Sequence, residues 1–167
     1  MQVQPHARDV VRAVVETDYS PLGDSIEIVG EKYAGDEAAI AVAFDDRNGW
    51  QRRGILGFRR AADETWRPSG AFMGSARPTG DLDVWMTWGG WGGDSREYTV
   101  LGGWVADPAA VAARATDAMT GRTLEEGVEN GVAIFMYAGD FGTRYARLEL
   151  LDAVGQVLRS GPLNRRP

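Results

Sequence analysis

The sequence contains no cysteine and a single histidine, His6, among its 167 residues. Without cysteine the chain has no disulfide, no thiolate nucleophile and no sulfur ligand for a metal ion. One imidazole is too few for the nitrogen-rich sites that bind zinc or redox metals. A glycine motif that could cradle a phosphate is also missing. We therefore expect neither a metal nor another cofactor.

The tripeptide Gly93-Asp94-Ser95 matches the nucleophile block of GDS-type hydrolases. A serine hydroxyl needs a neighbouring base to become a nucleophile, and His6 lies in the first residues of the chain. The strand-to-helix elbow that presents such a serine is not predicted around Ser95. We expect Ser95 to lie in a turn, and the sequence favours a non-enzymatic role.

Acidic and amide side chains gather at two places where a calcium ion would find oxygen ligands. Asp45, Asp46 and Asn48 lie in "DDRNG", and Asp81 and Asp83 lie in "DLD". Neither segment continues into a complete calcium-binding loop. Because aspartate and asparagine are ordinary turn residues, we expect turns at both places.

Basic residues are in the minority, since 18 lysines and arginines face 24 aspartates and glutamates, for a net charge of −6. Nucleic-acid-binding surfaces are broadly basic, so we expect no nucleic-acid partner. No apolar run approaches the roughly 20 residues that cross a bilayer, which argues against membrane insertion. The N-terminal segment lacks the apolar core of a signal peptide, so we expect a cytoplasmic protein. A chain from which an export signal had been removed would look the same.

Glycine is abundant, with 22 residues, and helical periodicity is confined to one segment near the start. In residues 5–16, valines at positions 10, 11, 14 and 15 form one apolar stripe, which predicts a short helix that lies on a sheet. Four antiparallel strands joined as hairpins follow, at 25–33, 37–45, 50–61 and 65–72. Pro68 predicts an edge position or a strand end, because proline cannot donate to the ladder.

Residues 73–80 lack apolar periodicity and predict a connection that divides the chain into sections 1–80 and 81–167. Strands in the second section are predicted at the spacing of a sandwich, at 82–88, 96–105, 110–117, 122–128, 132–138, 143–151 and 155–159. Asn130-Gly131 predicts a type I′ hairpin turn, since both residues tolerate positive φ. The predicted class is mainly β, with an N-terminal helix and antiparallel sheet followed by a small immunoglobulin-like β-sandwich section. The sequence leaves open whether the two sections share one core.

The order of elements resembles two known architectures. The helix and curved antiparallel sheet, with "ADETWRPSGAF" near its end, resemble the nuclear-transport-factor-2-like cone. The second section resembles a small immunoglobulin-like sandwich. If the first section is such a cone, its concave face would bind a small molecule, although the acid–base cluster of the enzymes is not visible. A fold alone does not assign a function.

Residues 84–105 hold four of the six tryptophans together with six glycines. Strand alternation places Trp88 with the core and Trp85 with the polar face. Trp104 is also expected in the core, because tryptophan buries a large area in small β proteins. Trp91 lies in the middle of a glycine-rich loop, where a large apolar group suggests a binding role.

These observations lead to a candidate contact surface and to three hypotheses. The residues predicted to bind a partner or ligand are Trp85, Trp91, Asp83, Asp94 and Tyr98. The first hypothesis is a binding or assembly protein that uses this surface to contact a protein, with a second copy of the chain as one candidate. The second is a carbohydrate-binding module, because indoles beside acceptors stack on sugars. The third is a small-molecule carrier or enzyme with a pocket in the first section, with arginines or Asp45 and Asp46 at its mouth.

Five arginines form a local basic patch in this acidic chain: Arg52, Arg53, Arg59, Arg60 and Arg67. Alternation places Arg52 and Arg60 on one face of the predicted strand, with Arg53 and Arg59 on the other. The patch could receive an anionic ligand or an acidic partner. Solvated strand faces and protection of a sheet edge are the simpler explanation.

Overall fold

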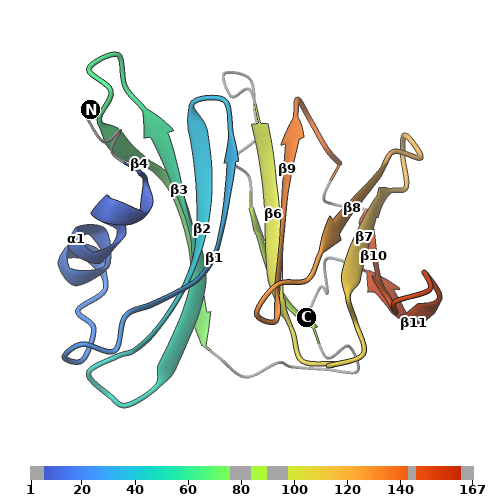
Figure 1. Ribbon diagram of the computed structural model, residues 1–167, viewed down its shortest axis with the longest axis horizontal. Coiled ribbons are helices and arrows are strands. Elements are labelled where there is room, and N and C mark those ends of the chain that lie inside the picture. Colours follow the sequence, from blue (N-terminus) through green and yellow to red (C-terminus); the bar gives the residue numbers. More distant parts are fainter. Residues whose placement is uncertain (1–5, 76–83, 90–97, 143–145, 163–167) are drawn as a thin grey trace. The chain divides into compact units, whose positions relative to one another are not determined.

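The computed structural model describes residues 6–75, 84–89, 98–142 and 146–162. Within them, one helix precedes eleven strands in antiparallel sheets, which confirms the predicted mainly β class with an N-terminal helix (Figure 1). The chain divides into two compact units, Met1–Ala76 and Arg77–Pro167. Each unit has its own cluster of buried apolar side chains.

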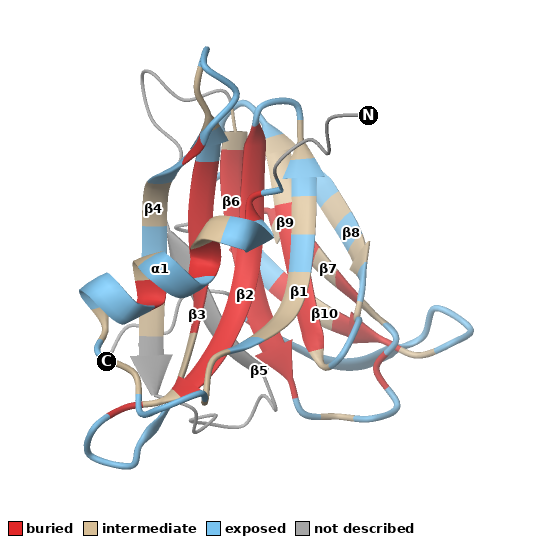
Figure 2. Cartoon of the chain, turned by 60° about the vertical axis from the view of Figure 1, so that its left-hand side comes forward, coloured by how far each residue is buried: buried red, intermediate tan, exposed pale blue. Residues whose placement is uncertain are grey.

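Helix α1 (Arg8–Asp18) lies across one face of the N-terminal sheet (Figure 2). The predicted valine stripe is its buried side, because Val11 and Val15 have no exposed surface and the valines beside them are partly buried. At the start of the helix, the Asp9 carboxylate accepts a hydrogen bond of 2.9 Å from the backbone N–H of His6. This bond fixes His6, the residue before the N-cap Ala7, against the first turn of the helix.

The N-terminal sheet has the order β1-β2-β3-β4. Its strands lie close to the predicted ranges: β1 (Glu27–Ala34), β2 (Glu37–Asp45), β3 (Gln51–Arg60) and β4 (Trp66–Ser75). Pro68 lies on the edge strand β4, opposite Phe58 where the β3–β4 register shifts, as expected for a residue without an N–H. The predicted connection at 73–80 is wrong at its start, since β4 continues through Ser75 by pairing with β3.

Apolar side chains from the helix and from three strands form the core of this unit. Ile40, Val42 and Phe44 of β2 alternate toward the helix, where they meet Leu56 and Phe58 of β3. All of these side chains are at most 2% exposed. The large residues of the alternation therefore form the face of β2 that packs toward the helix. The small residues between them, Ala39, Ala41 and Ala43, are buried as well, so both faces of β2 are buried.

The β2–β3 and β3–β4 hairpins use the same turn geometry, a type I turn closed by a left-handed residue. In residues 46–50 the left-handed residue is Gly49, with φ of 76°, and in residues 61–65 it is Glu64, with φ of 65°. The N–H groups of Gly49 and Glu64 donate to the first residue of each turn, at 2.9 Å in both. Glycine adopts this conformation freely, whereas an L-residue with a side chain loses roughly 1–2 kcal/mol there.

The C-terminal unit contains two antiparallel sheets. The first has the order β5-β6-β9, from β5 (Val84–Gly89), β6 (Tyr98–Val105) and β9 (Val132–Ala138). The second has the order β11-β10-β7-β8, from β7 (Ala112–Asp117), β8 (Thr123–Gly127), β10 (Ala146–Leu151) and β11 (Val157–Pro162). Side chains of both sheets share one core, including Leu101, Phe135, Ala115 and Leu148. The more specific immunoglobulin-like resemblance stays a prediction.

The Asn130-Gly131 turn has the predicted local conformation but a different context. Asn130 and Gly131 have φ of 51° and 72°, and Glu129 and Val132 exchange two backbone hydrogen bonds of 2.9 Å. The turn was predicted to join two paired strands, and this is wrong, because β8 and β9 belong to different sheets. Beyond the turn, β8 pairs with β7 and β9 pairs with β6, so these two strands separate.

Asp117, at the end of β7, is a buried acid that connects two loops. One carboxylate oxygen accepts from the N–H of Met119 at 2.9 Å, and the other accepts from the N–H of Gly142 at 3.0 Å. Burial by itself raises the pKa of Asp117, but the hydrogen bonds from Met119, Thr120 and Gly142 outweigh it and lower the pKa. The charged carboxylate therefore stabilises this end of the unit.

Candidate functional site

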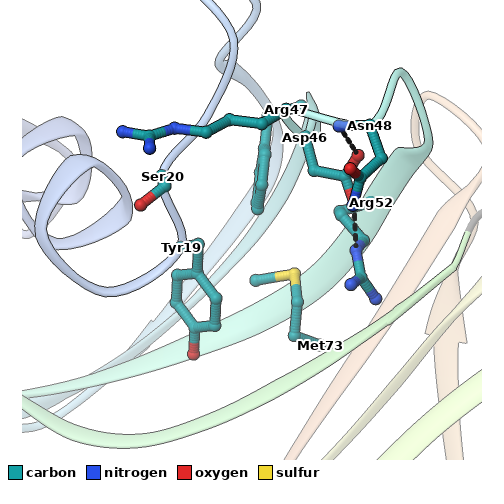
Figure 3. Close-up of a pocket in the computed structure, with 8 residues that line it drawn as sticks. Tyr19, Ser20, Asp46, Arg47, Asn48, Arg52 and Met73 are labelled. Carbon is teal, nitrogen blue, oxygen red and sulfur yellow. Dashed lines mark hydrogen bonds and ion pairs between the residues drawn. The ribbon is translucent and has the colours of Figure 1, made fainter.

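A pocket of about 410 Å³ lies within the N-terminal unit, where the end of α1 faces the β2–β3 turn (Figure 3). This volume lies in the range of small-molecule sites. The chain contributes to it from three separate segments: the residues after the helix, the β2–β3 hairpin and β4. The lining residues are Tyr19, Ser20, Phe44, Asp46, Arg47, Asn48, Arg52 and Met73.

Asp46 organises the turn at the pocket. One carboxylate oxygen accepts from the backbone N–H groups of Asn48 at 2.9 Å and Trp50 at 3.0 Å. The other accepts from the Arg52 Nε at 3.0 Å. The bond from Trp50, followed by those from Asn48 and Arg52, lowers the pKa of Asp46. Asp46 is therefore ionised at neutral pH, and its hydrogen bonds are directed at its own turn and at Arg52.

The Arg52 side chain is held in place through this contact with Asp46. Only its Nε is engaged, and within the described residues its two Nη atoms have no other partner. Arg52 is the cross-strand neighbour of Phe44, so its guanidinium lies at the edge of an apolar surface. A fixed guanidinium with free Nη groups is suited to bind a planar anion.

Arg47 and Asn48 provide further polar groups from the same turn. Figure 3 shows Arg47 extending from the turn in the direction of Ser20. Both side chains are exposed, and neither makes a hydrogen bond or an ion pair with another residue in the described ranges. Their donors are therefore available to a bound molecule.

The opposite side of the pocket is apolar. Phe44 is 2% exposed, and Tyr19 and Met73 are partly buried against the same core. The rings of Tyr19 and Phe44 lie 6.0 Å apart with an angle of 45° between their planes. Burial, and then the nearby Asp18 carboxylate, raise the pKa of Tyr19, so its hydroxyl keeps its proton at neutral pH. This hydroxyl is a hydrogen-bond donor beside an apolar surface.

The segment after the helix is attached to the end of β2 by backbone contacts. Pro21 forms an isolated bridge with Asp46, and the N–H of Leu22 donates to the carbonyl of Asp45 at 2.7 Å. Ser20 has φ of 49°, a left-handed conformation that is uncommon for serine. Such conformations persist where the surrounding structure holds them, and here the bridge at the next residue does so.

These side chains are suited to binding more than to proton transfer. The two titratable groups of the pocket with shifted pKa values, Asp46 and Tyr19, are shifted away from neutrality in opposite directions. A general acid or base works best with a pKa near the ambient pH. The pocket therefore combines fixed charges and hydrogen-bond donors with an apolar wall.

The surface predicted from the tryptophans is described only in part. Trp85 pairs in register with Trp104, whose side chain is 6% exposed, and Tyr98 is partly buried at the start of β6, opposite Ala138. Asp83, Trp91 and Asp94 lie outside the described residues, as does the rest of the Gly93–Ser95 motif. The predicted contact surface thus stays a prediction, whereas burial of Trp104 is confirmed.

Three arginines of the patch form ion pairs and keep much of their side chains exposed, in keeping with the expected solvated strand faces. Arg59 pairs with Glu37, Arg60 with Asp36 at 2.7 Å, and Arg67 with Asp63 at 3.1 Å. Protection of a sheet edge is wrong for β3, because this strand lies between β2 and β4. Arg52 and Arg60 do share a face, since Arg52 lines the pocket beside Phe44 and Arg60 lies 5.9 Å from the Trp66 ring.

Sequence reasoning singled out the β2–β3 turn with Asp46 and Asn48, and Arg52 beside it, but not the other residues of the pocket. Asp45, proposed together with Asp46, does not line it. Tyr19, Ser20 and Met73 had no signal, because they are far from the turn in the sequence and meet it only in the fold. The run of polar residues at the end of the buried strand β2, at positions 45–49, was the sign of this site in the sequence.

Residues 45–49, whose acidic and amide side chains could have been calcium ligands, form a turn as expected. In the described part of the chain, no group of three or more histidine, cysteine, aspartate or glutamate residues could hold a metal ion. The helix in that part is too short to cross a membrane.

Comparison of the chain with protein-family models, with curated proteins and with solved structures finds no match.

Proposed function

We propose that this protein binds a small molecule, without transforming it, in the pocket of its N-terminal unit. The observation that carries the proposal is the pocket itself, of about 410 Å³, in which an apolar wall faces donors that other side chains leave free. A few convergent polar groups on a largely apolar concavity are typical of ligand sites.

Two features of the pocket favour binding over catalysis. Its arginines and hydroxyls donate hydrogen bonds, while the carboxylate of Asp46 is occupied by its own turn and by Arg52. The pKa values of Asp46 and Tyr19 lie further from neutrality than usual, which suits a fixed charge and a fixed donor. This proposal corresponds to the third hypothesis from the sequence, in its carrier form.

The proposal is tested by titrating the full chain with a panel of neutral and charged aromatic fragments, followed by ¹H–¹⁵N correlation spectra. We expect binding fragments to shift the backbone amides of Tyr19, Ser20, Asn48 and Arg52. A Met73→Trp variant should fill the pocket and remove these shifts, while the rest of the spectrum reports that the chain is folded.

The matched control is Met119→Trp, which makes the same substitution at a methionine that is 74% exposed in the other unit. This variant should bind the fragments like the wild type. If no fragment moves the pocket amides, or if both variants bind equally well, the proposed function is wrong.

Protein binding through Trp85 and Trp91 stays a separate proposal, with carbohydrate binding as its alternative. It is tested by comparing the partners captured by the wild type and by a Trp85→Ser/Trp91→Ser double variant, alongside a titration with glycans. Identical captured proteins and no response to glycans would argue against both.

A further inference from the structure

The two arginines of the pocket come from one hairpin, Arg47 from the β2–β3 turn and Arg52 from β3, and they differ in how they are held. Arg52 is fixed by its 3.0 Å hydrogen bond to Asp46, which is fixed in turn by two backbone N–H groups. Arg47 is exposed and has no partner among the described residues. The pocket thus presents one oriented guanidinium and one that can move toward a bound molecule.

The charge of the lining residues favours an anion. Asp46 contributes one negative charge against the two positive charges of Arg47 and Arg52, which leaves one positive charge in excess. The chain as a whole has a net charge of −6, so this local excess is opposite to the overall balance. A single excess charge matches a monoanion better than a dianion, because a second negative charge would stay uncompensated.

The free groups of Arg52 point to the shape of that anion. Since Nε donates to Asp46, the N–H groups that remain are on the two Nη atoms, and their parallel arrangement matches the two oxygens of a carboxylate. Beside them, Phe44, Tyr19 and Met73 form an apolar wall that a ring would contact.

We infer that the ligand is a small aromatic carboxylate, an inference that rests on the proposed function. The carboxylate of the ligand binds Arg52 and Arg47. Its ring lies against Tyr19, Phe44 and Met73. Arg52 provides the oriented contact, and Arg47 closes over the carboxylate from the turn. The protonated Tyr19 hydroxyl and the Asn48 amide are further donors for polar substituents.

The test compares benzoate with benzamide, which has nearly the same shape but no charge, in titrations of the full chain at neutral pH. We expect benzoate to bind at least about tenfold more tightly, as for a charge-assisted pair of hydrogen bonds. Phenyl phosphate, which is largely a dianion at this pH, should bind no more tightly than benzoate.

Variants then assign the preference to the arginines. Arg52→Gln and Arg47→Gln should each weaken benzoate binding by about three- to tenfold and weaken benzamide binding less, so that the preference for benzoate falls. Because Arg47 is exposed, its variant keeps the fold even if the Arg52 variant does not. The matched control is Arg67→Gln, on β4, whose arginine is exposed and pairs with Asp63; it should bind both probes like the wild type.

The outcomes separate the inference from the proposed function. Equal binding of benzoate and benzamide at the pocket amides overturns the carboxylate but keeps the small-molecule site. Much tighter binding of phenyl phosphate overturns the carboxylate in favour of a phosphate ester. If neither benzoate nor benzamide moves the pocket amides while other fragments do, the ligand class is wrong; if no fragment does, the proposed function fails as well.

Discussion

Replacement of Asp117 by asparagine should strongly destabilise the C-terminal unit. Each carboxylate oxygen of Asp117 accepts a backbone hydrogen bond, from Met119 on one side and from Gly142 on the other. An amide has only one oxygen, so either orientation of asparagine directs an NH₂ group at a backbone N–H. At least one bond is lost, two donors face each other, and the bonds that remain, including those from Thr120, are no longer made to a charged group.

The size of the effect follows from these contacts. A hydrogen bond to a charged group contributes about 1.5–3 kcal/mol, and a neutral bond about half as much. Because Asp117 is 2% exposed, water cannot replace the lost acceptor. We expect the free energy of unfolding to fall by about 2–3 kcal/mol, which lowers the Tm by roughly 4–12 °C for a chain of this size.

The matched control is Asp152→Asn in the β10–β11 hairpin. There a single oxygen accepts both bonds, from Val154 at 3.0 Å and from Gln156 at 2.8 Å, so an amide oxygen can keep both. Urea unfolding of both variants, followed by circular dichroism, measures the difference. The reasoning is refuted if Asp117→Asn stays within about 0.5 kcal/mol of the wild type, or if Asp152→Asn is equally destabilised.

Three further predictions concern the same kinds of contact. Gly142→Ala should cost about 1–3 kcal/mol in urea unfolding, because its Cβ would lie 2.8 Å from an Asp117 oxygen, whereas Gly127→Ala meets nothing within 4 Å and should cost less than about 0.5 kcal/mol. Glu64→Gly should stabilise the chain by up to about 1 kcal/mol, since glycine relieves the left-handed strain at φ of 65°; a loss of stability in thermal unfolding would contradict this. Since the folded-state pKa of Asp117 is lowered, its contribution is fully present above the unfolded pKa of about 3.9 and is lost as pH falls through the folded pKa. The stability gap between wild type and Asp117→Asn, measured in urea from pH 7 to pH 2.5, should therefore narrow below about pH 4; a constant gap would contradict the assignment.

Local sequence patterns were sufficient to predict the elements of this protein. The valine stripe predicted α1, and the alternation of Ile40, Val42 and Phe44 predicted the face of β2 that packs toward the helix. The turn at residues 45–49 was predicted as well, because its aspartate and glycine have conformational preferences of their own. Periodicity and turn chemistry act over a few residues, so they are written in the local sequence.

Pairing between distant segments was decided only by the tertiary structure. Asn130-Gly131 takes its predicted conformation, yet β8 and β9 separate into different sheets, where β8 pairs with β7 and β9 pairs with β6. Likewise, the arginines of β3 belong to a central strand, which no pattern within residues 50–61 reveals. Sheet order depends on which faces can be buried together, a property of the whole unit.

The candidate site divides in the same way. Asp46 and Arg52 were singled out from the sequence as residues at the mouth of a pocket, whereas Arg47 was not. Tyr19 and Met73 complete that pocket from 27 residues on either side of Asp46. Their side chains resemble ordinary core residues until the chain folds, because a cavity exists only where distant surfaces meet without filling the space between them.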